Sequence, residues 1–206
     1  MKKWFKTVTI MFVLLMLMLT MCSCWDKREL AELAVILGCG VDLDESGKLS
    51  LTIEVVHATS EEQANESMIY QASGYSLNEC LYGLKKQLDK ELLWDDLTVI
   101  IFGDSLDASA RQYGAFICYQ ELKNTGAVLL LRSKGPAGAI FSGKFGEADF
   151  VSQGLADSIK LNDKHRSGSL WTVADYLEKS MMMIDINDQL PKASIADEEV
   201  KLEYAG

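Results

Sequence analysis

Cys24 is the residue whose surroundings most clearly predict a chemical modification. Ser23, a small residue, precedes it, and residues 7–21 upstream carry no charge and are almost wholly apolar. Three lysines and no acidic residue occupy the first six positions. A basic start, an apolar run and a small residue before the cleavage point together indicate an export signal. We therefore predict that residues 1–23 are a cleaved lipoprotein signal peptide and that the Cys24 thiol is the lipid attachment site.

The length of the apolar run separates two forms of membrane attachment. Its 15 residues reach the upper end of a signal h-region, about 7–15, and fall short of the ~20 that span a bilayer. The alternative is an uncleaved signal anchor over residues 7–25, with Trp25 at the membrane interface. Both interpretations place the remaining chain outside the cytoplasm and attached to the membrane, and we favour the lipid anchor.

The charge of the mature chain limits its partners. Of 20 Lys and Arg residues, three lie in the leader, which leaves 17 basic against 30 acidic side chains and a net charge of −13. Phosphate backbones and anionic head groups repel such a surface. We therefore expect no nucleic-acid partner, and membrane contact only through the anchor.

Other residue types that support catalysis occur without their usual partners. His57 and His165 are far apart in sequence, and no GxSxG motif accompanies them. We expect both in loops or at strand ends. Gly38 and Gly40 are followed by strand residues, unlike a dinucleotide loop, and Asp95-Asp96 is expected in a solvated loop. We therefore predict no catalytic residue, no cofactor and no metal ligand, and hence a protein that is not an enzyme.

Sulfur-containing residues in the mature chain are expected mainly in the core. Cys39, Cys80 and Cys118 each have apolar neighbours, which is typical of small buried hydrophobic residues. An odd number cannot pair completely, and a disulfide between two of them is the alternative. Met181-Met182-Met183 is expected to pack in a core, although methionine clusters also serve adaptable interfaces.

The hydrophobic pattern of the first half predicts a β-hairpin and then a helix. Residues 33–41 form a continuous apolar run, residues 49–55 alternate like a half-buried strand, and a turn falls near Ser46-Gly47. Residues 57–73 lack a clear pattern and are expected to form a loop. A capping box at Ser76 and Glu79 predicts the start of a helix that extends to about Leu88.

The second half predicts further alternation of strands and helices. We expect strands at 97–102 and 126–131, a helix at 107–124, a short helix after Pro136, irregular structure at 142–169 and a helix from Thr172 to Met182. The inner side of the 107–124 helix is assigned to Ala108, Tyr113, Phe116, Ile117 and Tyr119-Gln120. This order favours a mixed α/β fold in which helices and strands alternate after the hairpin, with part of the sheet parallel.

The last segment, 191–206, is predicted to be extended. Residues 199–204 alternate like a strand, and no turn follows before Gly206. We expect this strand to be unpaired and to begin a further, missing domain. The predicted organisation is thus a signal peptide at 1–23, a globular domain at 24–190 and an extended segment at 191–206.

A family resemblance is carried by two motifs. Cys24-Trp25-Asp26-Lys27-Arg28-Glu29-Leu30 and Leu37-Gly38-Cys39-Gly40-Val41-Asp42 resemble the start of the C-subunit family of spore germinant receptors, the Ger(x)C family. In that family a lipidated cysteine is followed by Trp-Asp, and a hydrophobic strand then ends in Gly-x-Gly-Val/Ile-Asp. The segments 73–77 and 97–103 also match in order, so the resemblance covers essentially the whole chain.

The resemblance implies a non-enzymatic subunit of a nutrient germinant receptor that takes part in spore germination. Such a protein would be lipid-anchored through Cys24 on the outer face of the inner spore membrane, beside multi-pass A and B subunits. Members of the family are longer, which implies that 24–190 is their N-terminal domain. The alternative from another functional class is a lipid-anchored solute-binding protein of a transporter, which needs two lobes around a cleft.

Overall fold

The computed structural model describes residues 4–12, 33–57, 66–121, 127–165 and 170–204. It divides into two units, Met1–Glu32 and Leu33–Gly206. In the first unit residues 4–12 are helical, and Thr9 Oγ1 donates a hydrogen bond to the Phe5 carbonyl at 2.9 Å. Within the described ranges, no helix has the length and apolar character needed to cross a membrane.

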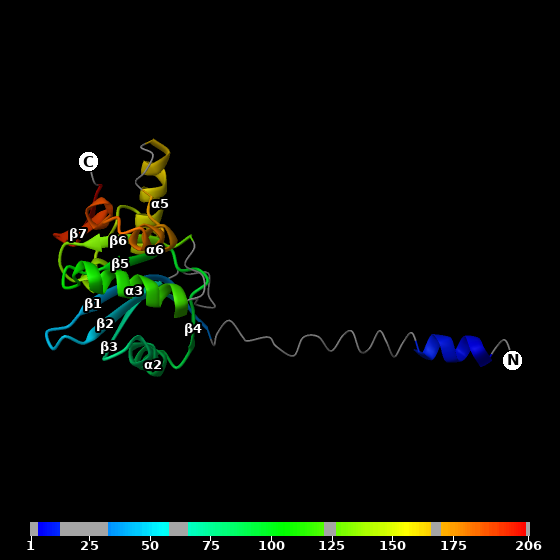
Figure 1. Ribbon diagram of the computed structural model, residues 1–206. Coiled ribbons are helices and arrows are strands. Elements are labelled where there is room, and N and C mark those ends of the chain that lie inside the picture. Colours follow the sequence, from blue (N-terminus) through cyan, green and yellow to red (C-terminus); the bar gives the residue numbers. More distant parts are fainter. Residues whose placement is uncertain (1–3, 13–32, 58–65, 122–126, 166–169, 205–206) are drawn as a thin grey trace. The chain divides into compact units, whose positions relative to one another are not determined.

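One mixed eight-stranded sheet organises the second unit (Figure 1). Its strands run in the order β3-β2-β1-β5-β6-β7-β8, and β4 pairs with the start of β1. β1, β5, β6 and β7 are parallel, whereas β2, β3 and β8 each pair antiparallel with a neighbour. The predicted mixed α/β fold that begins with a β-hairpin is therefore confirmed. The strands are β1 (Leu33–Leu43), β2 (Leu49–His57), β3 (Glu66–Gly74), β4 (Glu91–Leu93), β5 (Val99–Phe102), β6 (Leu129–Ser133), β7 (Lys192–Ala196) and β8 (Glu199–Glu203).

Helices cover both faces of this sheet. α2, α3 and α6 contribute to one hydrophobic cluster, whereas α4 and α5 contribute to the other. Figure 1 shows α2 and α5 on opposite sides of the strands. The helices are α2 (Leu77–Leu88), α3 (Ala108–Glu121), α4 (Ala137–Ile140), α5 (Val151–His165) and α6 (Val173–Met181), followed by the 3-10 turn η4 (Asn187–Gln189).

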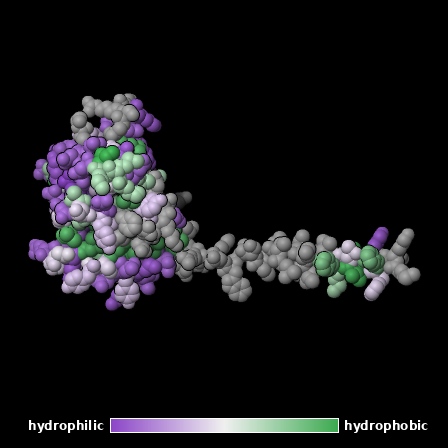
Figure 2. Space-filling model, in the orientation of Figure 1, coloured by the Kyte–Doolittle hydropathy of each residue, from purple (hydrophilic) through white to green (hydrophobic). Residues whose placement is uncertain are grey.

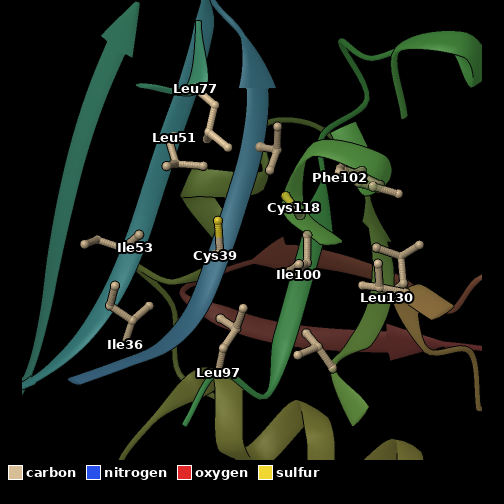
Figure 3. Close-up of a cluster of buried hydrophobic side chains, with 14 of the residues drawn as sticks. Ile36, Cys39, Leu51, Ile53, Leu77, Leu97, Ile100, Phe102, Cys118 and Leu130 are labelled. Carbon is tan, nitrogen blue, oxygen red and sulfur yellow. The ribbon is translucent and has the colours of Figure 1, made fainter. Parts of the chain in front are cut away.

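The larger cluster contains the three cysteines of the second unit. Cys39, Cys80 and Cys118 are all buried and free, and Figure 3 shows Cys39 and Cys118 among Ile100 and Leu51. The expectation that they act as small buried hydrophobic residues is confirmed. Burial raises the pKa of the Cys118 thiol to about 12, and burial together with the neighbouring thiols raises the pKa of Cys39 well above its usual value.

The face of β2 that points away from the larger cluster is polar and yet buried. Ser50, Thr52 and Glu54 alternate with the core residues of β2, and all three lie almost without solvent exposure. The prediction of a half-buried strand is wrong, because α4 and α5 cover this face as well. Close approach is possible because β1 carries glycine there: a Cβ at Gly38 would lie 1.8 Å from Ser152 Oγ on α5.

Two segments expected to be irregular form regular elements. β3, in the predicted loop 57–73, pairs with β2 over nine residues and forms one edge of the sheet. α5, within 142–169, places Val151, Leu155 and Ile159 in the second cluster. Their spacing of four residues is a helical signal, but the glycine-rich segment before α5 obscures it.

The signals that mark the starts of α2, α4 and α6 were predicted correctly. Ser76 accepts a hydrogen bond from Glu79 N at 3.3 Å, and Thr172 forms a capping box with Asp175 at the start of α6. Pro136 precedes the short α4. The Glu79 carboxylate reaches the amide of Tyr75 at 2.8 Å, one residue before the cap, so α2 has a variant of the predicted box.

Two further expectations are corrected. The terminal strand is paired, because β7 continues the sheet beside β6 and β8 pairs with β7. The existence of a domain beyond it stays a prediction. The assigned inner side of α3 is wrong for Ala108, Tyr113 and Tyr119, which are exposed. Arg111, Ala115 and Cys118 are buried instead. The side chains of Phe116, Ile117 and Gln120 lie outside the described part.

Candidate functional site

Two buried carboxylates, Asp42 and Glu54, lie at the starts of α4 and α5, and paired acids can perform acid–base chemistry. Asp42 accepts hydrogen bonds from the amides of Ala137 and Gly138 at 3.0 and 3.1 Å. Glu54 accepts from the amides of Val151 and Ser152 at 3.0 and 2.8 Å. Because backbone donors at the helix starts occupy their oxygens, these carboxylates anchor the helices to the sheet.

The buried position of Asp42 at the start of α4 changes the pKa of its carboxyl group. Burial raises the pKa of its carboxyl group above the usual value, and the hydrogen bonds from Ala137 and Gly138 lower it in part. Asp42 ends the Gly38-Cys39-Gly40-Val41-Asp42 motif, in which Gly38 and Gly40 lie against α5 and α4. The motif thus joins β1 to the two helices on that face.

The two histidines and the Asp95-Asp96 pair lie on different elements of the fold. His57 ends β2 and His165 ends α5, so the expectation of a strand-end position holds for His57, whereas His165 belongs to a helix. Asp95 and Asp96 are exposed in the turn before β5, as predicted. Cys24, the predicted lipid site, lies outside the described residues. No cluster of three or more metal-ligating side chains occurs in the described ranges.

The most distinctive surface feature is an apolar groove between α3 and α6. It has a volume of about 610 Å³ and is lined mainly by Tyr113 and Tyr119 from α3 and by Ala174, Leu177 and Met181 from α6. The two helices contact one another along the sheet, and both contribute residues to the larger core cluster. The groove therefore lies where two core-packed helices meet.

Three methionines at the end of α6 and just after it extend this apolar surface. Met181, Met182 and Met183 are exposed by 74, 57 and 96%, and Ile184 is also exposed. The expectation that the methionine cluster packs in a core is wrong, and the interface alternative fits their exposure. Figure 2 shows hydrophobic areas standing out on a largely hydrophilic face of the domain. Exposed apolar surface of this kind typically marks an interaction site.

A polar network fixes one end of the groove. Asn187 Oδ1 accepts hydrogen bonds from Arg111 Nε on α3 at 2.9 Å and from the Tyr176 hydroxyl on α6 at 3.1 Å. Arg111 also donates to the Leu106 carbonyl. Desolvation and the nearby Arg132 lower the pKa of Arg111, and burial raises the pKa of Tyr176. The network holds the two helices in one arrangement.

The acidic side chain of Glu178 lines the groove, and Asp185 lines an adjoining hollow together with Met183 and Ile184. No lysine or arginine occurs among the described lining residues of the groove. Sequence inspection missed the groove because its tyrosines were assigned to the core.

The fold is a mixed α/β sheet covered by helices on both faces, with an apolar groove between α3 and α6. Comparison with protein-family models assigns residues 26–183 to the spore germination protein N-terminal domain. This match spans more than half of the chain, so the chain belongs to that family, and the resemblance inferred from its motifs is confirmed. The family links the chain to spore germination. Neither the curated proteins nor the solved structures gave a match.

Proposed function

We propose that this chain is a lipid-anchored, non-enzymatic subunit of a nutrient germinant receptor. It is held on the extracytoplasmic face of the inner spore membrane through Cys24 and assembles there with multi-pass A and B subunits. The family match over residues 26–183 is the observation that carries this proposal. The signal-like leader with Cys24 at its end supports the mode of attachment.

The physical properties of the domain support assembly as its function. Its acidic carboxylates in the core are occupied by backbone amides, whereas several exposed apolar groups, among them Tyr113, Tyr119 and Met181, line the α3–α6 groove. A groove that binds a protein needs no catalytic group, and the buried network at its end keeps it preformed. Preformed surfaces bind with a smaller loss of conformational entropy.

Replacement of the predicted anchor residue tests the attachment. Cys24→Ser is expected to abolish incorporation of labelled palmitate and cleavage of the leader in the spore-forming host. Cys22→Ser is the matched control, because it changes a cysteine two positions earlier and should keep both. Unprocessed, unlabelled wild-type protein in the membrane would instead establish the signal anchor.

Germination of spores that lack the chain tests the receptor function. Such spores should lose the response to the nutrients served by this receptor, and the wild-type gene should restore it. His57→Ala and His165→Ala should restore it equally, because no histidine chemistry is proposed. Loss of the response in either well-folded variant would contradict the non-enzymatic part of the proposal.

A further inference from the structure

We propose that the α3–α6 groove, extended by Met181–Ile184, binds an amphipathic helix from another receptor subunit, with basic residues beside the apolar face of that helix. This inference rests on the proposed receptor function and adds the surface and the chemistry of the partner. It is carried by three observations: the exposed apolar lining, the backbone conformation at Met183 and the charge around the groove.

The exposed lining contributes little to the fold. Tyr113 is 66% exposed and Met181 is 74% exposed, although each belongs to a helix whose other face packs in the core. Tyrosine and methionine are enriched in protein interfaces, where tyrosine supplies a rigid anchor and methionine adapts its shape. Their exposure along one groove is explained by a partner that covers them.

Met183 occupies a backbone position that favours glycine. The amide of Ile184 donates to the Lys179 carbonyl at 3.0 Å, and the amide of Met183 donates to the Ser180 carbonyl at 3.0 Å. These two bonds form a Schellman motif, whose left-handed residue is usually glycine. Met183 has a φ of 58° and is 96% exposed. A large apolar side chain here strains the backbone without packing inside the domain, which indicates a function at the surface.

The charge around the groove selects one kind of occupant. Glu178 lies in the lining, and Asp185 lines the adjoining hollow beside Met183 and Ile184. A second copy of this chain would bring two acidic rims together, and anionic lipid would be repelled in the same way. A helix with lysine or arginine beside its apolar face complements both the lining and the rim.

The size of the groove suits a short helix. Ser109 and Tyr119, which both line it, are ten residues apart on α3, and this separation corresponds to about 15 Å along the helix axis. A partner helix of about three turns covers that distance. It presents anchors at positions i, i+3 or i+4 and i+7, the usual pattern of helix-in-groove recognition.

Co-purification from a membrane that contains the whole receptor tests the groove. The full-length chain is produced with tagged A and B subunits, and the amount that co-purifies after detergent extraction is measured. Tyr113→Ala and Met183→Gly should each reduce it at least tenfold. Met183→Gly is decisive, because glycine suits the backbone there and the thermal midpoint should be unchanged or higher. Leu161→Ala, which removes an exposed apolar residue of α5, is the matched control and should have no effect.

Charge reversal tests the basic partner. Glu178→Lys should reduce co-purification at least fivefold, whereas Asp157→Lys on α5 should leave it unchanged. Loss in the Tyr113 and Met183 variants without loss in Glu178→Lys would overturn the basic flank. Mutual capture of two differently tagged copies through the groove would overturn the choice of partner.

The outcomes also separate this inference from the proposed function. If wild-type protein co-purifies with the A and B subunits and the groove variants do so equally, the groove inference fails and the receptor function stands. If wild-type protein does not co-purify with them, both fail.

Discussion

Arg111 on α3 donates its Nε–H to Asn187 Oδ1 at 2.9 Å, although 76 residues separate the two in the chain. Tyr176 on α6 donates to the same oxygen. One amide oxygen therefore joins the two helices that form the groove to the turn that follows them. Removal of the Asn187 side chain leaves two buried donors without their acceptor, which lowers the stability of the fold.

Asn187→Ala is expected to reduce the free energy of unfolding by about 2–3 kcal/mol, because both donors lose their acceptor. Urea unfolding of the full-length protein in detergent measures the change. Asp188→Ala is the control: its ion pair with Arg132 involves a side chain that is 95% exposed, so its effect should stay below about 0.5 kcal/mol. Equal effects of the two substitutions would contradict the importance of the network.

Gly38→Ala is expected to reduce the free energy of unfolding by about 1–3 kcal/mol, the usual cost of overpacking a core. The new Cβ would lie 1.8 Å from Ser152 Oγ and 2.7 Å from the Phe141 ring. Ser152→Gly should recover part of this loss, because it removes one of the two obstacles. The coupling free energy from the double-mutant cycle checks the contact, and additivity of the two changes would argue against it.

Asp42→Asn is expected to destabilise the protein by about 1–2 kcal/mol, because its NH₂ group cannot accept the second backbone N–H. The pH dependence should also change. The pKa of Asp42 is raised from its usual value of 3.8, so the folded state binds the proton more tightly than the unfolded state. The wild-type contribution is complete below that value and decreases as pH rises through the raised folded pKa. Unfolding measured across this window should therefore show the slope in wild type and its loss in the variant.

The buried thiols should react only after unfolding. At pH 8 the pKa of Cys118, raised to about 12 by burial, leaves almost no thiolate, and Cys39 and Cys80 are shifted in the same direction. A thiol reagent should thus label none of the three in the native protein and all three in denaturant. Rapid labelling of Cys39 in the native state would contradict its burial.

Met183→Gly should raise the free energy of unfolding by up to about 1 kcal/mol, because glycine adopts the left-handed conformation without the steric cost of a side chain. Met182→Gly is the control, since Met182 has a φ of −80° and gains no such relief. Thermal unfolding compares the two. A lower midpoint for Met183→Gly would show that its side chain stabilises the domain itself.

The sequence by itself determined the features that depend on neighbouring residues. The alternation in β2 and the turn near Gly47 specify the hairpin, and Ser76 and Thr172 specify the starts of α2 and α6, because each signal acts within a few residues. The motifs between Cys24 and Asp42 also identified the family. They could not explain why Gly38 and Asp42 occur in β1, since their partners lie on helices about a hundred residues later.

Only the tertiary structure decided which polar groups are buried and which apolar groups are exposed. Glu54 has the strand position of a solvated residue, yet the amides at the start of α5 neutralise its burial cost. Tyr113 and Met183 have core-like side chains, yet the packing of α3 against α6 leaves them at the surface. Hydrophobic periodicity reports only that an element has two faces. Long-range packing determines what covers each face, and it is this packing that creates the groove.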